Sequence, residues 1–148
     1  MNIWLTGSEG QLGRALRGSL PQVLQNSVEL IATSRSGGDG LVALDLADAD
    51  ACRAAVLDAQ PDWVINAGAY TAVDRAETEP DLVHAVNALA PRAFAEALAQ
   101  TGGRLLQLST DFVFSGRQGH PYKLDQSRDP LGVYGSTKAA GELSLIHI

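Results

Sequence analysis

Residues 2–13 read NIWLTGSEGQLG, and this stretch decides the fold. Its first part, residues 2–6, is a short apolar run of the kind that forms a strand buried in a parallel sheet. Glycines follow at positions 7, 10 and 13, and a helical stretch over 14–20 comes next, which we expect Pro21 to end. A strand, a glycine turn and a helix in direct succession indicate the first half of a βαβ unit.

The same alternation continues along the chain. Helices are expected over 48–60, over about 81–101 and from near Tyr134, and Pro61 and Gly102-Gly103 end the first two. Further strands are predicted at residues 28–33, 41–44, 63–67 and 104–108. Short strands that alternate with helices predict one α/β domain over 1–148, a Rossmann-like doubly wound parallel sheet with helices on both faces.

The glycine spacing predicts a phosphate-binding turn. Gly7 permits the tight turn, Gly10 lets the backbone approach a pyrophosphate, and Gly13 lets the helix pack on the strand. The N-terminus of the helix attracts the phosphate charge. Because the turn directly follows a strand and opens a helix, it indicates a dinucleotide site, to which Gln11 and Leu12 are also assigned.

The end of the second predicted strand bears on the choice of dinucleotide. An acidic residue usually stands there to bind the ribose 2′-hydroxyl. Here the loop contains Arg35, and its first acidic residue is Asp39. A guanidinium can instead bind a 2′-phosphate, so the sequence favours NADPH, with NADH as the alternative. Asp45 and Leu46 are expected beside the adenine, although Asp45 can also be a helix-capping loop acid.

Three side chains predict the chemistry. Tyr134 and Lys138 are four residues apart and share a face of a helix. A cation beside a tyrosine lowers its pKa from the ordinary value of about 10, which makes the phenol a useful proton donor. Thr110 follows the fifth strand, where its hydroxyl can bind an oxygen that gains charge during hydride transfer. The alternative for Tyr134 and Lys138 is an ordinary surface pair.

Four stretches, at 67–74, 86–91, 109–116 and 134–142, carry a resemblance to the dTDP-4-dehydrorhamnose reductases of the extended short-chain dehydrogenase/reductase superfamily. The resemblance implies NADPH-dependent reduction of the 4-keto group of dTDP-4-dehydro-L-rhamnose to dTDP-L-rhamnose, with Thr110, Tyr134 and Lys138 catalytic. Gly68, Phe112 and Ser115 depart from the family's usual Ala, Tyr and Asp. The residues assigned to the cofactor on these stretches are Ala67, Gly68, Ala69, Tyr70, Asn87, Tyr134 and Lys138; a structural loop role is the alternative for Tyr70.

Pro91 lies inside the long predicted helix and cannot donate a hydrogen bond to the carbonyl of Asn87. By the same resemblance, we expect this free carbonyl to hold a water near Lys138; a proline that only bends the helix is the alternative.

An acidic stretch at the start of this helix is expected to complement its dipole, and it consists of Asp74, Glu77, Glu79 and Asp81.

Composition excludes several other classes of function. The net charge of −6 argues against binding a nucleic acid polymer, and no apolar run approaches the roughly 20 residues that cross a bilayer. Cys52 is the single cysteine, which excludes an internal disulfide and fits a cytoplasmic protein; we expect it in a helix core rather than as a catalytic thiol. The spacing of His84, His120 and His147 predicts no metal site.

The resemblance also implies a longer enzyme, whose later part supplies further strands and the nucleotide-sugar pocket. We therefore expect a truncated chain that is inactive alone, with residues 143–148 departing from the family pattern and ending the catalytic helix, which leaves Leu145 and Ile146 uncovered. A homodimer of the whole enzyme stays open.

Two other functions are considered. The first is a non-catalytic NAD(P)-binding regulatory subunit, and Thr110, Tyr134 and Lys138 together argue against it. The second is an epimerase or dehydratase of the same superfamily that acts on another nucleotide sugar. Residues 70–74 (YTAVD) and 109–114 (STDFVF) favour the reductase over this second function.

Overall fold

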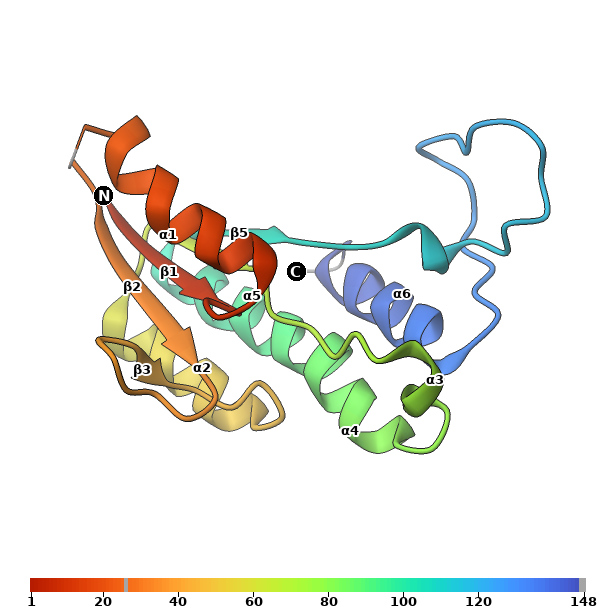
Figure 1. Cartoon of the computed structure of the whole chain (residues 1–148), viewed down its shortest axis with the longest axis horizontal. Helices are drawn as coiled ribbons and strands as arrows, with labels where there is room; N and C mark the ends of the chain where they lie inside the picture. Colours follow the sequence, from red (N-terminus) through yellow and green to blue (C-terminus); the bar gives the residue numbers. More distant parts are fainter. Residues whose placement is uncertain (26, 147–148) are drawn as a thin grey trace.

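The computed structural model describes residues 1–25 and 27–146. Its sheet has five parallel strands in the order β3-β2-β1-β4-β5 (Figure 1). The strands are β1 (Asn2–Thr6), β2 (Glu29–Ser34), β3 (Val42–Ala43), β4 (Trp63–Asn66) and β5 (Arg104–Gln107). The chain moves outward from β1 to β3 and then returns to the other side of β1, which confirms the doubly wound topology and places the switch point between β1 and β4.

Helices cover both faces of the sheet, as the sequence predicts. On one face, α1 (Gln11–Val23) packs Leu16 and Leu20 against Ile3, Leu5 and Ile65. On the other face lie α2 (Ala49–Ala59) and α5 (Ala90–Thr101), whose apolar sides meet Trp4 and Val64 around the fully buried Phe94. The central position of β1 explains its continuous apolar run, because both of its faces are buried.

Two helix ends differ from the prediction. Pro21 does not end α1, which continues to Val23. Proline removes only the hydrogen bond to the carbonyl of Arg17, an exposed residue that water can reach, and the N–H of Leu24 still donates to the carbonyl of Leu20 at 3.0 Å. The last helix, α6 (Val133–Ile146), does not end at Glu142, because the residues that follow contain neither proline nor glycine to stop it.

The long predicted helix consists of three consecutive segments. These are α4 (Pro80–His84), the π-helical turn η1 (Ala85–Leu89) and α5. The widened turn ends two residues before Pro91, and the N–H of Ala90 donates to the carbonyl of Ala85. Two further short elements were not predicted: α3 (Val73–Ala76) and the 3₁₀ turn η2 (Asp111–Val113).

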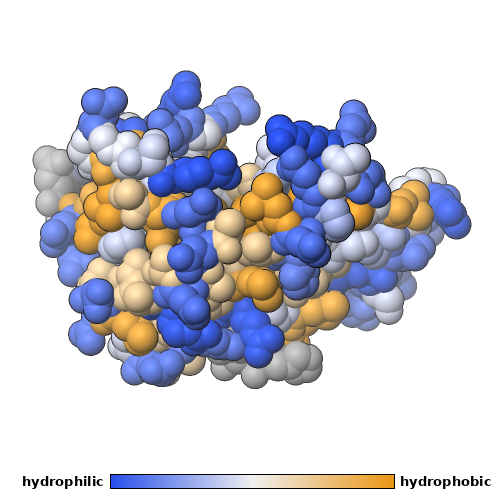
Figure 2. Space-filling view, turned by 90° about the horizontal axis from the view of Figure 1, so that it is seen from below, coloured by the Kyte–Doolittle hydropathy of each residue, from blue (hydrophilic) through white to orange (hydrophobic). Residues whose placement is uncertain are grey.

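The surface is mixed in character. Figure 2 shows hydrophobic side chains in separate groups between hydrophilic ones on the face that it presents. The loop between η2 and α6 projects away from the sheet (Figure 1). Within the described ranges, no helix is long and apolar enough to cross a membrane.

Candidate active site

The glycine turn lies at the carboxyl ends of β1 and β4. Gly7 has a φ of +64°, and a Cβ there would lie 2.5 Å from the backbone nitrogen of Gly68. A Cβ on Gly13 would lie 2.1 Å from the carbonyl oxygen of Gly7, so this helix packs on the turn only with glycine. Gly10 caps α1 without a side chain, which leaves the first N–H groups of the helix to face an incoming anion.

A cavity of about 150 Å³ opens at this turn. Among its lining are seven residues assigned to the cofactor from the sequence: Gly7, Gly10, Arg35, Asp45, Leu46, Gly68 and Ala69. Sequence reasoning missed the other lining residues, which are Ser8, Glu9, Thr33, Ser34, Leu44 and Val86. For Thr33 and Ser34 a signal was present, since they stand at the carboxyl end of the second predicted strand.

Arg35 and Asp45 face each other across this cavity. The Nε of Arg35 lies 3.7 Å from Oδ1 of Asp45, and the two side chains are 73% and 46% exposed. An ion pair this exposed contributes about 0–1 kcal/mol, so the guanidinium can leave it for a stronger anion. Asp45 also accepts the N–H of Ala47 at 2.9 Å, which matches its alternative role as a loop-capping acid.

Ser8 holds the glycine turn to the neighbouring strand. Its side chain is fully buried, and its hydroxyl donates to the carbonyl of Leu5 at 3.1 Å while it accepts the N–H of Thr33 at 3.1 Å. The turn is therefore fixed at both β1 and β2, which keeps the cavity preformed.

Lys138 is the most deeply buried charged group of the site, with 5% of the residue exposed. Its Nζ donates to the carbonyl of Leu108, at the end of β5, over 2.6 Å. Burial lowers the pKa of the lysine, and the carboxylate of Glu142 one turn along the helix opposes that shift. Tyr134 is half-buried one turn before Lys138, as their spacing predicts.

Thr110 lies at the start of η2, directly beyond the fifth strand. Its hydroxyl donates to Oδ1 of Asp111 at 3.2 Å and accepts the N–H of Phe112 at 3.3 Å. The ring of Phe112 meets the ring of Tyr134 edge-on, with the centroids 5.5 Å apart. Thr110 and Tyr134 thus belong to segments in direct contact.

Helix α6 is placed by close backbone approaches. A Cβ on Gly135 would lie 2.3 Å from the carbonyl oxygen of Phe112, and one on Gly141 would lie 2.3 Å from the carbonyl oxygen of Asn87. Both glycines are needed for the helix to pack against η2 and η1. The carbonyl oxygen of Asn87 therefore faces α6; that Pro91 leaves it free to hold a water stays a prediction.

The side chain of Asn87 is buried and joins two parts of the site. Its Oδ1 accepts the N–H of Tyr70 at 2.9 Å, and its Nδ2 donates to the carbonyl of Tyr70 at 3.1 Å and to the hydroxyl of Thr137 at 3.3 Å. It thereby ties the loop after β4 to α6. The Tyr70 hydroxyl donates to Oε2 of Glu79 at 2.6 Å.

The remaining residues assigned to the cofactor lie around the cavity rather than among its lining. Gln11 and Leu12 open α1 at the surface, and Gly13 serves helix packing. Ala67 packs with the apolar cluster on the α1 face of the sheet.

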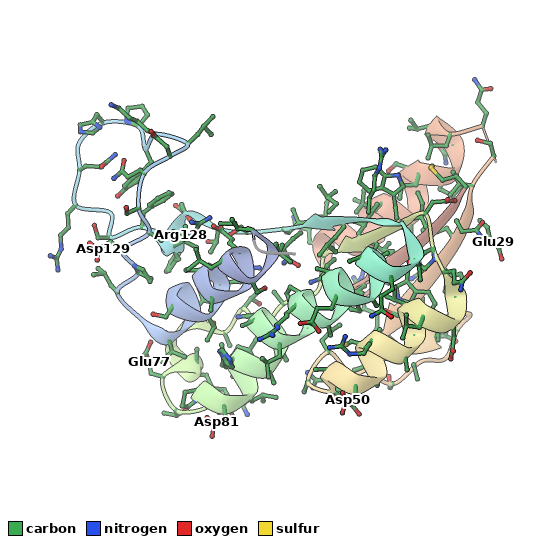
Figure 3. All side chains as sticks on the ribbon, turned by 180° about the vertical axis from the view of Figure 1, so that it is seen from behind. Glu29, Asp50, Glu77, Asp81, Arg128 and Asp129 are labelled. Carbon is green, nitrogen blue, oxygen red and sulfur yellow. The ribbon has the colours of Figure 1, made fainter. Side chains whose placement is uncertain are left out.

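The acidic stretch does not act on the long helix as a unit, so that expectation is corrected. Only Asp81 lies in the first turn of α4. Glu77 instead accepts the N–H of Val133 at 2.8 Å, at the start of α6, and Figure 3 shows it beside that helix. Glu79 pairs with Arg75 at 2.5 Å. Asp74 lies in the first turn of the short α3.

A second pocket, of about 300 Å³, adjoins Tyr134. Of its lining, sequence reasoning had assigned Tyr134 to catalysis and had noted Phe112 and Ser115 as departures from the family pattern, and it missed the other residues. The full lining is Val73, Asp111, Phe112, Phe114, Ser115, Gly116, Leu131, Gly132, Tyr134 and Gly135. It is a largely apolar hollow beside the phenol of Tyr134.

An ion pair and a ring stack hold the loop that forms this pocket. Arg128 pairs with Glu142 of α6, which also accepts the hydroxyl of Ser109, and Figure 3 shows Arg128 beside that helix. The rings of Phe114 and Tyr122 stack with centroids 4.2 Å apart.

The remaining candidate groups are the single cysteine and the histidines. Cys52 is fully buried in the core, and burial raises the pKa of its thiol to about 12. In the part of the chain that the structure describes, no group of three His, Cys, Asp or Glu residues could hold a metal ion. His147 lies outside the described residues.

Comparison with known proteins places the chain in a family. The family model described as "RmlD substrate binding domain" matches residues 1–147, which include residues 143–147, contrary to the expectation that these depart from the family pattern. The dTDP-4-dehydrorhamnose reductase of Streptomyces griseus is 43% identical over 146 residues, covering 98% of this chain and 45% of the relative. The enzyme of the same name from Salmonella typhimurium is 37% identical over 154 residues, covering 98% and 46%.

Solved structures of similar proteins point to the same family as the sequence comparisons. A dTDP-4-dehydrorhamnose reductase from Clostridium acetobutylicum superposes with a TM-score of 0.87 at 35% identity, over 99% of this chain and 49% of the other. One from Bacillus anthracis, in complex with NADP, gives a TM-score of 0.86 at 30% identity over 99% and 49%. The chain thus spans about half the length of the relatives it matches. By this match over nearly all its residues, the chain belongs to the RmlD substrate-binding-domain family.

Proposed function

We propose that this chain carries the nicotinamide-cofactor site and the proton-donating residues of a reductase that converts the 4-keto group of dTDP-4-dehydro-L-rhamnose to the alcohol of dTDP-L-rhamnose. The observation that carries the proposal is that Lys138 donates to Leu108 at the same sheet edge where the glycine turn lines a cavity. The names of the relatives and the NADP bound to one of them support it.

The cavity residues fit a dinucleotide. Gly7 and Gly13 leave no room for a side chain at the turn, and the N–H groups at the start of α1 would hold the pyrophosphate. Arg35 would leave Asp45 to bind a 2′-phosphate, which favours NADPH, with NADH as the alternative. When bound, the nicotinamide supplies the hydride.

Lys138 and Tyr134 prepare the proton transfer. An ammonium has three donors, and Leu108 takes one of them, so the others remain for a ribose hydroxyl and for the tyrosine side of the site. The buried ammonium of Lys138 and the phenol of Tyr134 lie one turn apart on the same face of α6. Tyr134 then protonates the sugar oxygen as the carbonyl is reduced.

Thr110 would orient the sugar carbonyl. Its hydroxyl, which now donates to Asp111, can turn to the oxygen that gains charge. The sugar ring would lie in the pocket beside Tyr134, against Val73 and Phe112. We further propose that the rest of the longer enzyme binds the nucleotide part of the sugar; a dimer of that enzyme and a cytoplasmic location stay predictions.

The test is NADPH oxidation with dTDP-4-dehydro-L-rhamnose, measured on this chain and on its complete reading frame. We expect stoichiometric NADPH oxidation and dTDP-L-rhamnose from the complete enzyme, and none from the chain alone. A regulatory subunit would bind NADPH without oxidising it, and an epimerase would change the sugar without net NADPH consumption. Either result would contradict the proposal.

A further inference from the structure

A row of polar side chains crosses the sheet at its carboxyl edge. Thr6 of β1 pairs in register with Asn66 of β4, which pairs in turn with Gln107 of β5. Thr6 and Asn66 are fully buried. The hydroxyl of Thr6 donates to Oδ1 of Asn66, and Nδ2 of Asn66 donates to Oε1 of Gln107 at 2.6 Å.

Each end of the row reaches a different part of the candidate active site. At one end, the N–H of Gly68, which lines the cofactor cavity, donates to the hydroxyl of Thr6 at 3.2 Å. At the other end, Nε2 of Gln107 donates to the carbonyl of Leu108 at 2.8 Å. That carbonyl is also the acceptor of Lys138, at 2.6 Å, so both of its lone pairs are used.

The two ends fix the direction of every hydrogen bond between them. A backbone N–H can only donate, so the Thr6 oxygen accepts from Gly68 and its proton points to Asn66. A backbone carbonyl can only accept, so Gln107 must turn its nitrogen to Leu108 and its oxygen to Asn66. Reversing either amide would set two acceptors against each other in a buried place.

We propose that Gln107 is a positioning residue for Lys138. It sets the orientation of the Leu108 carbonyl, and this carbonyl sets the place of the lysine ammonium. Through Asn66 and Thr6, the same row joins the ammonium to the backbone that lines the cofactor cavity. The inference rests on the proposed function only in treating Lys138 as the catalytic lysine.

The composition of the chain makes the ammonium directly measurable. Lys123 and Lys138 are its two lysines, and Lys123 is exposed in the projecting loop. With ¹⁵N-labelled lysine, nuclear magnetic resonance therefore follows two ammonium groups, and Lys123 reports free exchange with solvent. Gln107→Met removes both hydrogen bonds at nearly constant shape, and Gln100→Met makes the same change on the exposed side of α5 as a matched control.

We expect Gln107→Met to speed the exchange of the Lys138 ammonium protons by about fivefold, the effect of losing one ordinary hydrogen bond. The pKa of Lys138, lowered by burial in the native chain, should rise toward the ordinary lysine value of about 10.4 as the ammonium gains solvent. Glu142, the carboxylate that acts on Lys138, is unchanged in the variant. Gln100→Met should alter neither quantity.

A folded Gln107→Met protein with native exchange and native pKa at Lys138 would overturn the proposal. If this variant does not fold, Gln107→Glu replaces it, because the carboxylate still accepts from Asn66 but cannot donate to Leu108. It should speed the exchange of the Lys138 ammonium protons as Gln107→Met does, and native exchange would be equally decisive against the proposal. Neither readout depends on turnover, so failure of the reductase assay would leave this test intact.

Discussion

The carboxylate of Glu77 accepts the backbone N–H of Val133 at 2.8 Å, although 56 residues separate them in the chain. This contact supplies the start of α6 with an acceptor from outside the helix, one residue before Tyr134. A carboxylate at this place satisfies a donor that the helix leaves unpaired, and it also complements the helix dipole.

Glu77→Ala should therefore lower the free energy of unfolding by about 1 kcal/mol, the usual loss when a helix cap is removed. Glu77→Gln keeps an oxygen acceptor and should retain most of the stability. Chemical denaturation measures both, with Asp58→Ala, which removes an exposed carboxylate from α2, as the control. Equal stability of Glu77→Ala and the native chain would show that the contact does not hold α6.

Two glycines of α1 offer a matched pair. Gly13→Ala places a Cβ 2.1 Å from the carbonyl oxygen of Gly7, whereas a Cβ on Gly18 meets nothing within 4 Å. Gly13→Ala should displace the turn and abolish NADPH binding. Gly18→Ala should stabilise the protein by up to about 1 kcal/mol, because alanine favours a helix interior. Fluorescence titration with NADPH and thermal unfolding check both; native NADPH affinity in Gly13→Ala would contradict the assigned turn.

Arg35→Ala tests the preference for NADPH. A charge-assisted contact to a 2′-phosphate is worth about 1.5–3 kcal/mol, so the variant should bind NADPH roughly ten to a hundred times more weakly. Its NADH affinity should stay close to native, because NADH lacks that phosphate. Arg117→Ala, at an exposed place in the projecting loop, is the control. If Arg35→Ala lost affinity equally for NADPH and NADH, Arg35 would not bind the 2′-phosphate.

Cys52 should make the stability fall in alkaline solution. Burial raises the pKa of its thiol from 9.0 to about 12 in the folded chain, so above pH 9 the unfolded chain releases a proton that the folded chain retains. The contribution of Cys52 to the free energy of unfolding is complete below pH 9. It is lost at up to about 1.4 kcal/mol per pH unit as the pH rises toward 12. The difference in unfolding free energy between the native chain and Cys52→Ala should shrink over this interval; a constant difference would contradict the assignment.

Local sequence patterns were sufficient for much of the fold. The apolar run of β1 and the glycines at 7, 10 and 13 are adjacent in sequence. The turn that they form is set by backbone sterics within a few residues, so the sequence predicts it. The spacing of Tyr134 and Lys138 likewise follows from helix geometry. Pro21 misled the prediction, because a proline near the exposed end of a helix costs one solvated hydrogen bond rather than the helix itself.

What sequence reasoning missed depends on contacts between distant segments. Nothing in the spacing of Val73 and Leu131 shows that they line one pocket, and nothing near Val133 indicates that Glu77 caps its helix. The sequence did not predict the polar row at the sheet edge either, because the register between β4 and β5 is what places Gln107 beside Asn66. Register and loop closure are set by tertiary packing, which local patterns do not encode.

The most direct test of the central claim compares the native enzyme with Tyr134→Phe, both in the complete reading frame. NADPH oxidation is followed with dTDP-4-dehydro-L-rhamnose, and NADPH affinity is measured in parallel. We predict that Tyr134→Phe loses at least about 100-fold in turnover, the lower range for general acid catalysis, and retains native NADPH affinity. Turnover at the native rate in Tyr134→Phe would contradict the account, because the proton would then come from another group.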